Sequence, residues 1–239
     1  MDIITSKDNA RISAARKLLQ KKYRDKESLY LIEGFHLLEE ALKANVQLTE
    51  IFVSADKVEN TLLANLQLTV VSDEVLKSLS DEKTPQGVVA VVKKAETMRP
   101  KKGKFLVLEN VQDPGNVGTM IRTADAAGYD AVICLGNTGD IYSPKVLRSA
   151  QGSHFHLPVL KSDTFPETDN LLVTTLSADS RDYHDLSRLT DFALVMGNEA
   201  QGVSAAALAA ATQKVHIPMS GRAESLNVAV AAGILMFGI

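Results

Sequence analysis

Apolar and polar residues follow two patterns along the chain, and each pattern predicts one kind of secondary-structure element. Short runs of Val, Ile and Leu predict buried strands, because both faces of such a strand are apolar. Apolar residues at every third or fourth position predict helices. The predicted strands lie at 29–32, 49–53, 68–71, 87–92, 105–110, 131–136, 171–176, 192–197 and 214–217. The predicted helices lie at 7–22, 35–43, 57–66, 73–79, 117–127, 143–150 and 226–237.

The order of these elements predicts the fold class. Strands and helices alternate along the chain, which is typical of α/β proteins. In the second half, strongly apolar strands alternate with helices, and this favours a mostly parallel sheet with helices on both faces. The segment 93–104 breaks the pattern with five lysines, an arginine, a proline and a glycine. This composition is typical of a linker, so we predict a small α/β domain at 1–95, a linker at 96–104 and a second domain at 105–239.

The composition excludes several classes of protein. Of the 239 residues, 45% are apolar and 23% are charged, which matches globular proteins and not disordered or coiled-coil chains. No apolar run approaches the roughly 20 residues of a membrane helix, and the N-terminus lacks a basic stretch followed by an apolar one. We therefore expect a cytoplasmic protein that does not associate with membranes. Cys134 is the only cysteine, which excludes an internal disulfide and a cysteine-cluster metal site.

Charge is distributed unevenly between the two predicted domains. Residues 1–104 hold 18 Lys and Arg against 15 Asp and Glu, whereas residues 105–239 hold 8 against 14. This asymmetry indicates two modules with different partners. Between positions 11 and 26 only Asp25 is acidic, and the basic residues are Arg11, Arg16, Lys17, Lys21, Lys22, Arg24 and Lys26. The cluster either binds a polyanion or forms an ordinary solvated helix face.

Three segments at or just beyond the carboxyl ends of predicted strands have unusual compositions. They are NVQDPGNVGTMIRTAD at 110–125, MGNEAQGVS at 196–204 and IPMSGRAESLN at 217–227. Open α/β sheets bind ligands at this edge. Each segment leads into a helix, whose free N–H groups favour the anionic parts of ligands. We therefore expect the three segments to form one site.

Several residues of these segments also have an ordinary structural explanation. Asn116 and Ser225 can cap helices, and Asp-Pro-Gly is a common turn. Gly197 and Gly202 suit either a turn or a backbone that approaches a ligand closely. Arg122 lies among small residues of an amphipathic helix and fits a surface residue and an anion-binding residue equally well. The functional interpretation rests on the three segments together.

The same segments resemble the three sequence motifs of the SpoU (TrmH-like) RNA 2′-O-ribose methyltransferases, within the SPOUT superfamily. DPGNVGTMIRTADAAG, MGNEAQG and IPMSGRAESLNVAVA match these motifs in order and spacing over about 105–237. The N-terminal sequence NARISAARKLLQKKYRDKESLYLIEGFHLLEEAL is similar, more weakly, to the L30-like substrate-binding domain that precedes the catalytic domain in many members. The resemblance implies a SPOUT fold with a deep trefoil knot near its C-terminus, and a homodimer.

The resemblance also implies a cofactor and its site. SpoU proteins bind S-adenosylmethionine in the knot, mainly through backbone groups, and need no metal. Mapped onto this sequence, the cofactor-binding residues are Leu176, Ser177, Gly197, Asn198, Glu199, Ile217, Pro218, Met219, Leu226 and Asn227. The sequence has no GxGxxG fingerprint, which argues against a common dinucleotide site but not against this different pocket.

The implied reaction is the methylation of a ribose 2′-hydroxyl. The implied catalytic residues are Arg122, Asn116, Glu199, Ser225 and Asn227. By analogy Arg122 is the principal one, sometimes described as the base. Because a guanidinium is essentially always protonated, we expect it to bind the target phosphate and stabilise the developing alkoxide. Glu199 is the more ordinary proton acceptor, and the other three would orient the ribose and the loops.

The resemblance implies an RNA substrate, and the additional N-terminal domain favours ribosomal RNA. The residues expected to contact RNA are Arg11, Arg16, Lys17, Lys21, Lys22, Arg24 and Arg122. Phosphate contacts of this kind give affinity rather than sequence readout. A transfer RNA substrate and a non-catalytic RNA-binding protein are the alternatives. His154 and His156 would share one face of a strand without a partner to complete a metal site, so we expect no metal.

Overall fold

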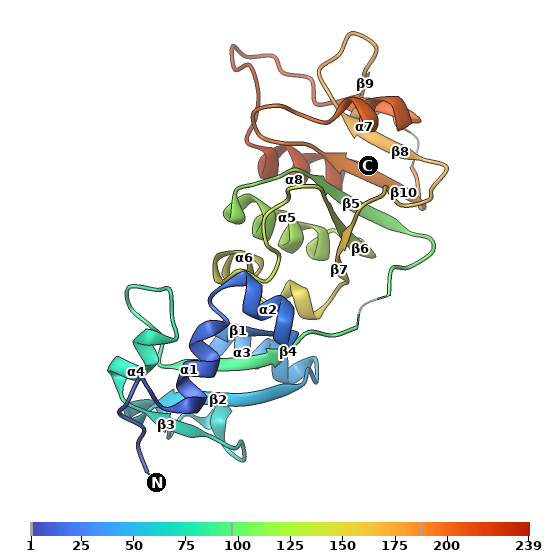
Figure 1. The fold of residues 1–239 in the computed structure, drawn as a ribbon. Coiled ribbons are helices and arrows are strands. Elements are labelled where there is room, and N and C mark those ends of the chain that lie inside the picture. Colours follow the sequence, from blue (N-terminus) through green and yellow to red (C-terminus); the bar gives the residue numbers. More distant parts are fainter. Residues whose placement is uncertain (1, 97, 187) are drawn as a thin grey trace. The chain divides into compact units, whose positions relative to one another are not determined.

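The computed structural model describes residues 2–96, 98–186 and 188–239, and Figure 1 shows its ribbon. The chain forms two compact units. The first contains Met1–Glu96 together with Tyr142–Phe155, and the second contains Thr97–Ile141 together with His156–Ile239. The segment 142–155 therefore packs with the first unit, although it follows the predicted linker in the sequence.

The first unit is built on a mixed four-stranded sheet. Its strands are β1 (Leu29–Glu33), β2 (Leu48–Ser54), β3 (Thr69–Val71) and β4 (Val88–Lys93), in the order β1-β4-β2-β3. β4 pairs antiparallel with β1 and β2, whereas β2 pairs parallel with β3. Successive residues of a strand point to opposite faces. Because all residues of β4 except Lys93 are buried, both faces of the sheet must be covered.

Helices cover these two faces. They are α1 (Ala10–Lys17), α3 (Phe35–Lys43), α4 (Asp73–Ser78) and α6 (Pro144–Ala150). α1 and α4 contribute to an apolar cluster that contains Phe52 on one face. α3 and α6 contribute to a second cluster, which contains Ile32 and Leu147, on the other face.

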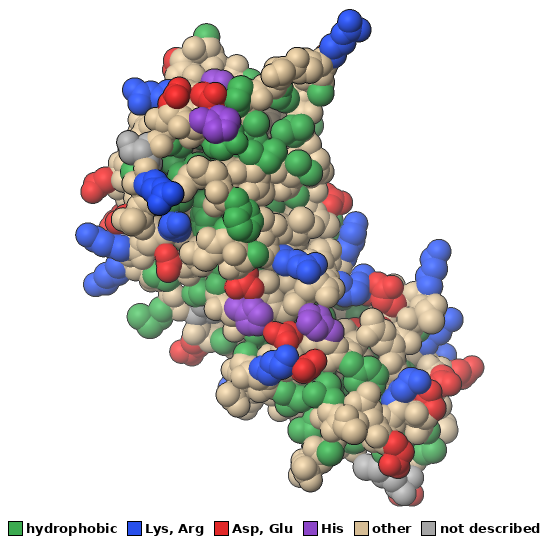
Figure 2. All heavy atoms as spheres, turned by 180° about the vertical axis from the view of Figure 1, so that it is seen from behind, with side chains coloured by type: hydrophobic (Ala, Val, Ile, Leu, Met, Phe, Trp, Pro, Cys, Tyr) green, Lys and Arg blue, Asp and Glu red, His purple; other side chains and the backbone are tan. Residues whose placement is uncertain are grey.

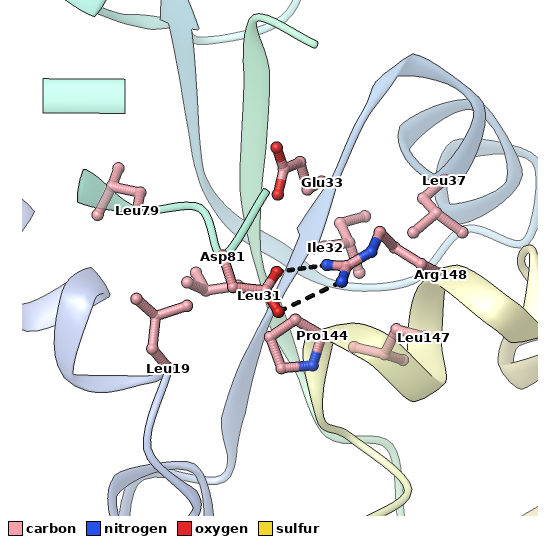
Figure 3. Close-up of a pocket in the computed structure, with 10 residues that line it drawn as sticks. All are labelled: Leu19, Leu31, Ile32, Glu33, Leu37, Leu79, Asp81, Pro144, Leu147 and Arg148. Atoms are coloured by element: carbon pink, nitrogen blue, oxygen red, sulfur yellow. Dashed lines mark hydrogen bonds and ion pairs between the residues drawn. The ribbon is translucent and has the colours of Figure 1, made fainter. Parts of the chain in front are cut away.

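Arg148 links α6 to the rest of the first unit, as Figure 3 shows. Its Nη2 lies 3.3 Å from Oδ2 of Asp81, and its Nε lies 2.6 Å from Oε1 of Glu82. Glu33 lies beside this ion pair in the close-up. Burial raises the pKa of the Glu33 carboxyl above its ordinary value, against the opposing effects of a hydrogen bond from Ser80 and of the charge on Arg148.

The predicted single helix at 7–22 is wrong. The chain forms α1, turns at 18–20 and then forms a second helix, α2 (Lys21–Glu27). The apolar pattern conceals this break because Leu18, at the turn, is 3% exposed and fills the same position that a helical residue would fill.

The predicted helix at 57–66 is also wrong. Two short 3₁₀ turns, Ala55–Lys57 and Thr61–Leu63, take its place. The side chain of Asn60 accepts a hydrogen bond from the N–H of Leu62 and so begins the second turn. Asparagine favours such local bonds over the interior of a helix.

The second unit is built on a seven-stranded sheet in which every pairing between named strands is parallel. In sheet order the strands are β7 (Val159–Ser162), β6 (Ala131–Leu135), β5 (Lys104–Glu109), β10 (Phe192–Met196), β8 (Leu171–Thr174), β11 (Gln213–His216) and β9 (Arg181–Asp182). The predicted parallel α/β architecture is thus confirmed. From β5 the chain continues outward to β6 and β7, and the later strands lie on the other side of β5. Open sheets bind ligands where the direction changes in this way.

Helices lie on both faces of this sheet. They are α5 (Pro114–Ala126), α7 (Ala205–Ala210) and α8 (Val228–Gly238). α5 and α8 pack against each other, whereas α7 packs through Ala207 in a cluster with Phe105 and Val195. None of the described helices is long and apolar enough to cross a membrane. The strand order does not show a trefoil knot, which stays a prediction.

Three short elements of this unit are not predicted by the apolar pattern. β9 has two residues, β7 has four, and α7 lies in an alanine-rich run without helical periodicity. The predicted strand that would carry His154 and His156 on one face is wrong. His154 lies in the 3₁₀ turn Ser153–Phe155, and β7 begins only at Val159.

Candidate functional site

A cavity of about 570 Å³ lies at the carboxyl ends of β8, β10 and β11 in the second unit. The residues of its wall that the sequence predicted are Leu176, Gly197, Asn198, Glu199, Ile217, Met219, Ser225 and Leu226. Ser177, Pro218 and Asn227 adjoin the wall in the sequence but are not part of it. The second and third motif segments therefore meet around one cavity.

Gly197 allows two stretches of backbone to approach each other at the wall. A Cβ at this position would lie 2.4 Å from the carbonyl carbon of Gly202 and 2.4 Å from the nitrogen of Val203. These are backbone atoms, which cannot move aside as the end of a flexible side chain could. Gly202 has a φ of +70°, a conformation that side-chain-bearing residues rarely adopt. Both glycines are thus required by the shape of the loop.

Asn198 fastens this loop to the end of β5. Its backbone exchanges two hydrogen bonds of 2.9 Å with Gly202. Its Nδ2 donates to the carbonyl oxygen of Asn110 over 2.9 Å, and its Oδ1 accepts from the N–H groups of Ala200 and Gln201. The side chain is therefore used to fold the loop, and the loop joins the segment that opens the first motif.

Glu199 connects the second motif segment to the first. Its Oε1 accepts hydrogen bonds from Nδ2 of Asn116 over 3.1 Å and from the N–H of Asp113 over 3.3 Å. Its Oε2 accepts from the N–H of Gln112 over 3.4 Å. Desolvation raises the pKa of Glu199, but these hydrogen bonds outweigh it and hold the pKa below its ordinary value. The carboxylate is therefore ionised at neutral pH.

Asn227 connects the third segment to the first and also begins α8. Its Nδ2 donates to Oδ1 of Asn116 over 3.1 Å. Its Oδ1 accepts from the N–H groups of Ala229 and Val230, which makes Asn227 the N-cap of α8. Helix capping was considered for Ser225, and the structure gives this role to Asn227 instead.

The start of α5 is capped in a similar way by Asp113. Its side chain accepts a hydrogen bond of 2.9 Å from the N–H of Asn116. The cap considered for Asn116 is thus wrong, and the Asn116 side chain is left to link Glu199 with Asn227. The predicted catalytic residues Asn116, Glu199 and Asn227 form one chain of hydrogen bonds.

Arg122 lies on the exposed surface of α5 and does not line the cavity. Within the described ranges, its guanidinium forms no hydrogen bond or ion pair. Structural arginines are normally paired, so this guanidinium is available to an external anion. Of the predicted catalytic residues, Glu199 and Ser225 therefore line the cavity, whereas Asn116 and Asn227 join Glu199 through hydrogen bonds and Arg122 does neither.

Glu109 is a site residue that the sequence analysis missed. It ends β5 and is 7% exposed. Its two oxygens accept hydrogen bonds from the Oγ of Ser204 over 2.6 Å and from the N–H of Ser204 over 2.8 Å. It thus fixes the point where the loop ends and α7 begins. An acidic residue inside an apolar strand was the signal that could have identified it.

His216 was also missed, although it lines the cavity directly before the third segment. Its Nδ1 lies 2.9 Å from Oγ of Ser180, and this hydroxyl donates to the carbonyl oxygen of Ser177 over 2.6 Å. A hydroxyl has one proton, so Ser180 accepts from Nδ1. A neutral His216 ring then carries its proton on Nδ1, and its Nε2 is a hydrogen-bond acceptor.

The model of the SpoU rRNA Methylase family matches residues 103–237, more than half of the chain. The chain belongs to the SpoU rRNA methylase family. A second model, of the MRM3-like substrate binding domain, matches residues 9–90. The SpoU match includes the three motif segments and the cavity that the second and third of them line.

Known SpoU-type proteins resemble this chain over nearly its full length. It is 41% identical to the 23S rRNA (guanosine(2553)-2′-O)-methyltransferase RlmP of Bacillus subtilis, over 99% of this chain and 98% of the relative. Its fold is similar to that of an AdoMet-bound rRNA methyltransferase from Sinorhizobium meliloti, with a TM-score of 0.87, 31% identity and coverage of 99% and 96%. It also resembles the SpoU methyltransferase AviRb of Streptomyces viridochromogenes in complex with AdoMet, with a TM-score of 0.85, 26% identity and 96% coverage of both chains.

Apart from Arg122, the basic residues expected to contact RNA lie in the first unit of this SpoU protein, and they differ in accessibility. Arg11, Arg16, Lys17, Lys21 and Lys22 are exposed. Arg24 is only 3% exposed, and its Nη1 donates to the carbonyl oxygen of Leu18 over 2.6 Å. Arg24 thus ties α2 to the turn before it. In the described parts of the chain, no group of three or more His, Cys, Asp or Glu is placed to hold a metal ion.

Proposed function

We propose that this protein transfers a methyl group from S-adenosylmethionine to a ribose 2′-hydroxyl of ribosomal RNA. The cavity of about 570 Å³ carries the proposal, because the second and third motif segments line it and the first is hydrogen-bonded to both. The similarity to an rRNA 2′-O-methyltransferase of Bacillus subtilis and to two AdoMet-bound structures supports it. A cytoplasmic location is part of the same proposal.

The cavity suits S-adenosylmethionine in size and in charge. Small-molecule pockets have volumes of about 300–1,000 Å³, and this one lies within that range. Glu199 and Glu224 line it, whereas no Lys or Arg of the described residues does. The negative potential of two carboxylates favours a sulfonium cation. Leu176 and Leu226 line the cavity while 64% and 38% exposed, and they supply apolar surface for the adenosyl group.

Bound S-adenosylmethionine supplies an electrophilic methyl group. The chain must hold the ribose hydroxyl in line with it, and such positioning accounts for much of a rate enhancement. Asn116 is suited to this task because Glu199 and Asn227 fix both ends of its amide. The amide retains one further donor and one further acceptor position for the ribose. Ser225, at the cavity wall, adds a hydroxyl.

Glu199 and Arg122 would handle the charge that develops on the ribose oxygen. Glu199 is ionised at neutral pH and can accept a proton, but the hydrogen bonds that lower its pKa also make it a weaker base. The exposed guanidinium of Arg122 would bind the target phosphate and stabilise the alkoxide. Arg122 does not line the cavity, so its guanidinium would act on RNA that extends beyond the cavity wall.

A homodimer is the second part of the proposal. Val230 and Phe237 of α8 are 53% and 68% exposed and are seven residues apart, so they lie on one stripe of the helix. Figure 2 shows hydrophobic side chains gathered over the upper part of its view, with several Lys and Arg side chains towards the margins. An exposed apolar stripe of this kind favours an interface. Phe237→Lys should convert a dimer to a monomer in light scattering, and an unchanged mass would contradict the proposal.

Methyl transfer with labelled S-adenosylmethionine tests the function. Ribosomal RNA from a strain lacking the protein is the acceptor, and mapping of 2′-O-methyl groups with and without the protein identifies the nucleotide. Label in ribosomal RNA at a ribose oxygen is the expected result. Label in transfer RNA would favour the tRNA alternative, and RNA binding without transfer would favour a non-catalytic RNA-binding protein. Either result would overturn the proposal as stated.

A further inference from the structure

A second large cavity lies in the first unit, and no residue of the three motif segments lines it. Its volume is about 530 Å³, close to that of the cavity in the second unit. It is a groove between the helices α1 and α2 and the neighbouring ends of β1, β2 and β4. Its floor is apolar and includes Ala15, Leu18 and Val91, all at most 5% exposed. The volume is within the range of small-molecule pockets.

Charged residues of both signs line the groove, together with one aromatic ring. Arg11 pairs with Glu50 and Lys26 pairs with Glu27, which leaves Lys17 as the basic lining residue that forms no ion pair with a described residue. Tyr23 lines the groove, and the Nζ atoms of Lys17 and Lys22 lie 5.8 and 4.8 Å from the centroid of its ring. Neither lysine forms an ion pair with a described residue. Their ammonium groups can therefore turn to an incoming anion without breaking a salt bridge, and this turn leaves the ring to another partner.

Arg11 and Thr49 also line the groove. Arg11 is held by an ion pair with Glu50 and a hydrogen bond to Thr69, yet 56% of its side chain is exposed. Thr49 sits where the pairing of β2 with β4 shifts register, so that its side chain is directed differently from that of a regular strand. Thr49 is part of the groove lining. Its Oγ1 donates a hydrogen bond of 3.4 Å to the carbonyl oxygen of Val91, which holds the side chain at the groove.

We infer that this groove receives one unpaired nucleotide of the RNA substrate. The base enters against Tyr23 and the apolar floor, and the adjoining phosphate meets Lys17 and Lys22. An apolar slot beside an aromatic ring and exposed lysines matches the way proteins hold single-stranded nucleic acid, by stacking and by phosphate contacts. A double helix presents no free base, so the groove discriminates unpaired from paired RNA. The inference rests on the proposed function insofar as the partner is RNA.

Filling the groove tests this without disturbing its charges. Ala14 is an exposed residue of α1 that lines the groove, and Ala14→Leu keeps a good helix former there. The probes are a short fluorescent single-stranded oligoribonucleotide and the same strand annealed to its complement. Ala14→Leu in the full chain should weaken binding of the single strand by about tenfold and leave binding of the duplex unchanged. Ala209→Leu, on the exposed side of α7, is the matched control and should bind both probes as the wild type does.

Two lysine variants, one inside the groove and one outside it, provide the second measurement. Lys17→Ala should weaken binding of both probes and reduce its salt dependence, whereas Lys77→Ala, an exposed lysine of α4 outside the groove, should not. A 4-thiouridine in the single strand should crosslink to the peptide that contains Tyr23. Wild-type single-strand binding by Ala14→Leu, or equal losses for both probes, would overturn the inference.

The two proposals can fail separately. If the wild type methylates RNA while Ala14→Leu binds the single strand normally, the groove assignment is wrong and the methyltransferase assignment stands. If Ala14→Leu loses single-strand binding while the wild type transfers no methyl group, the reverse holds. Binding of S-adenosylmethionine should be equal in the wild type and Ala14→Leu, because the groove and the other cavity share no residue.

Discussion

Asn227 donates a hydrogen bond from its Nδ2 to Oδ1 of Asn116, with 3.1 Å between the two atoms and 111 positions between the residues. The same Asn116 donates from its Nδ2 to Glu199 over 3.1 Å. One amide side chain therefore joins the second and third motif segments to the first. Any change in its orientation alters the alignment of all three.

Replacing Asn227 should separate its two roles. Asn227→Asp keeps an oxygen for the cap of α8 and loses the donor to Asn116, so the melting temperature should stay near that of the wild type while methyl transfer falls by up to about 100-fold. Asn227→Ala should lose the cap as well and cost about 1 kcal/mol of stability. Calorimetry and single-turnover kinetics give the two readouts. Normal turnover in Asn227→Asp would contradict the positioning role.

Gly197→Ala should disrupt the cavity wall, because the new Cβ would lie 2.4 Å from backbone atoms of Gly202 and Val203. Overpacking of this kind costs about 1–3 kcal/mol. We expect a lower midpoint in denaturant unfolding and weaker binding of S-adenosylmethionine. Gly221→Ala is the matched control, since a Cβ there meets nothing within 4 Å. A wild-type midpoint in Gly197→Ala would show that the loop can open at little cost.

Arg122→Ala should reduce methyl transfer by about 10²–10³-fold, the usual effect of removing a group that stabilises developing charge. Its melting temperature should not change, because the side chain is exposed and forms no interaction within the described residues. Arg188→Ala, another exposed arginine of the second unit, is the control and should retain activity. Near-normal turnover in Arg122→Ala would reject the catalytic assignment.

Cys134 should react only when the protein unfolds. Burial raises the pKa of its thiol from the ordinary 9.0 to about 12, because a thiolate in the core of the sheet would have no solvent. Because the pKa of this thiol is higher in the folded state than in the unfolded state, the free energy of unfolding falls once the pH exceeds the unfolded-state pKa. The free energy of unfolding should thus fall between about pH 9 and about pH 12, and Cys134→Ala should reduce that fall. Alkylation of the native protein should follow its unfolding rate, and fast stoichiometric labelling would contradict the burial.

The sequence predicted the strongly apolar strands of the second unit well. Phe105 to Leu108 are buried on both faces of the sheet, so every position is apolar and the signal is continuous. It failed where the pattern was short or ambiguous. Leu18 continues the apolar spacing of a helix although it lies at a turn. Asn60 begins a 3₁₀ turn inside the predicted helix at 57–66.

For the site, the sequence by itself determined which segments carry chemistry, because three segments of unusual composition, which contain Asn116, Glu199 and Asn227, follow apolar strands. Tertiary structure alone decided what each side chain does. Glu199 and Asn227 meet at Asn116 only because parallel strands bring their carboxyl ends to one edge of a sheet. Arg122 lies outside the cavity. This placement depends on distances between segments, and no local sequence pattern records such distances.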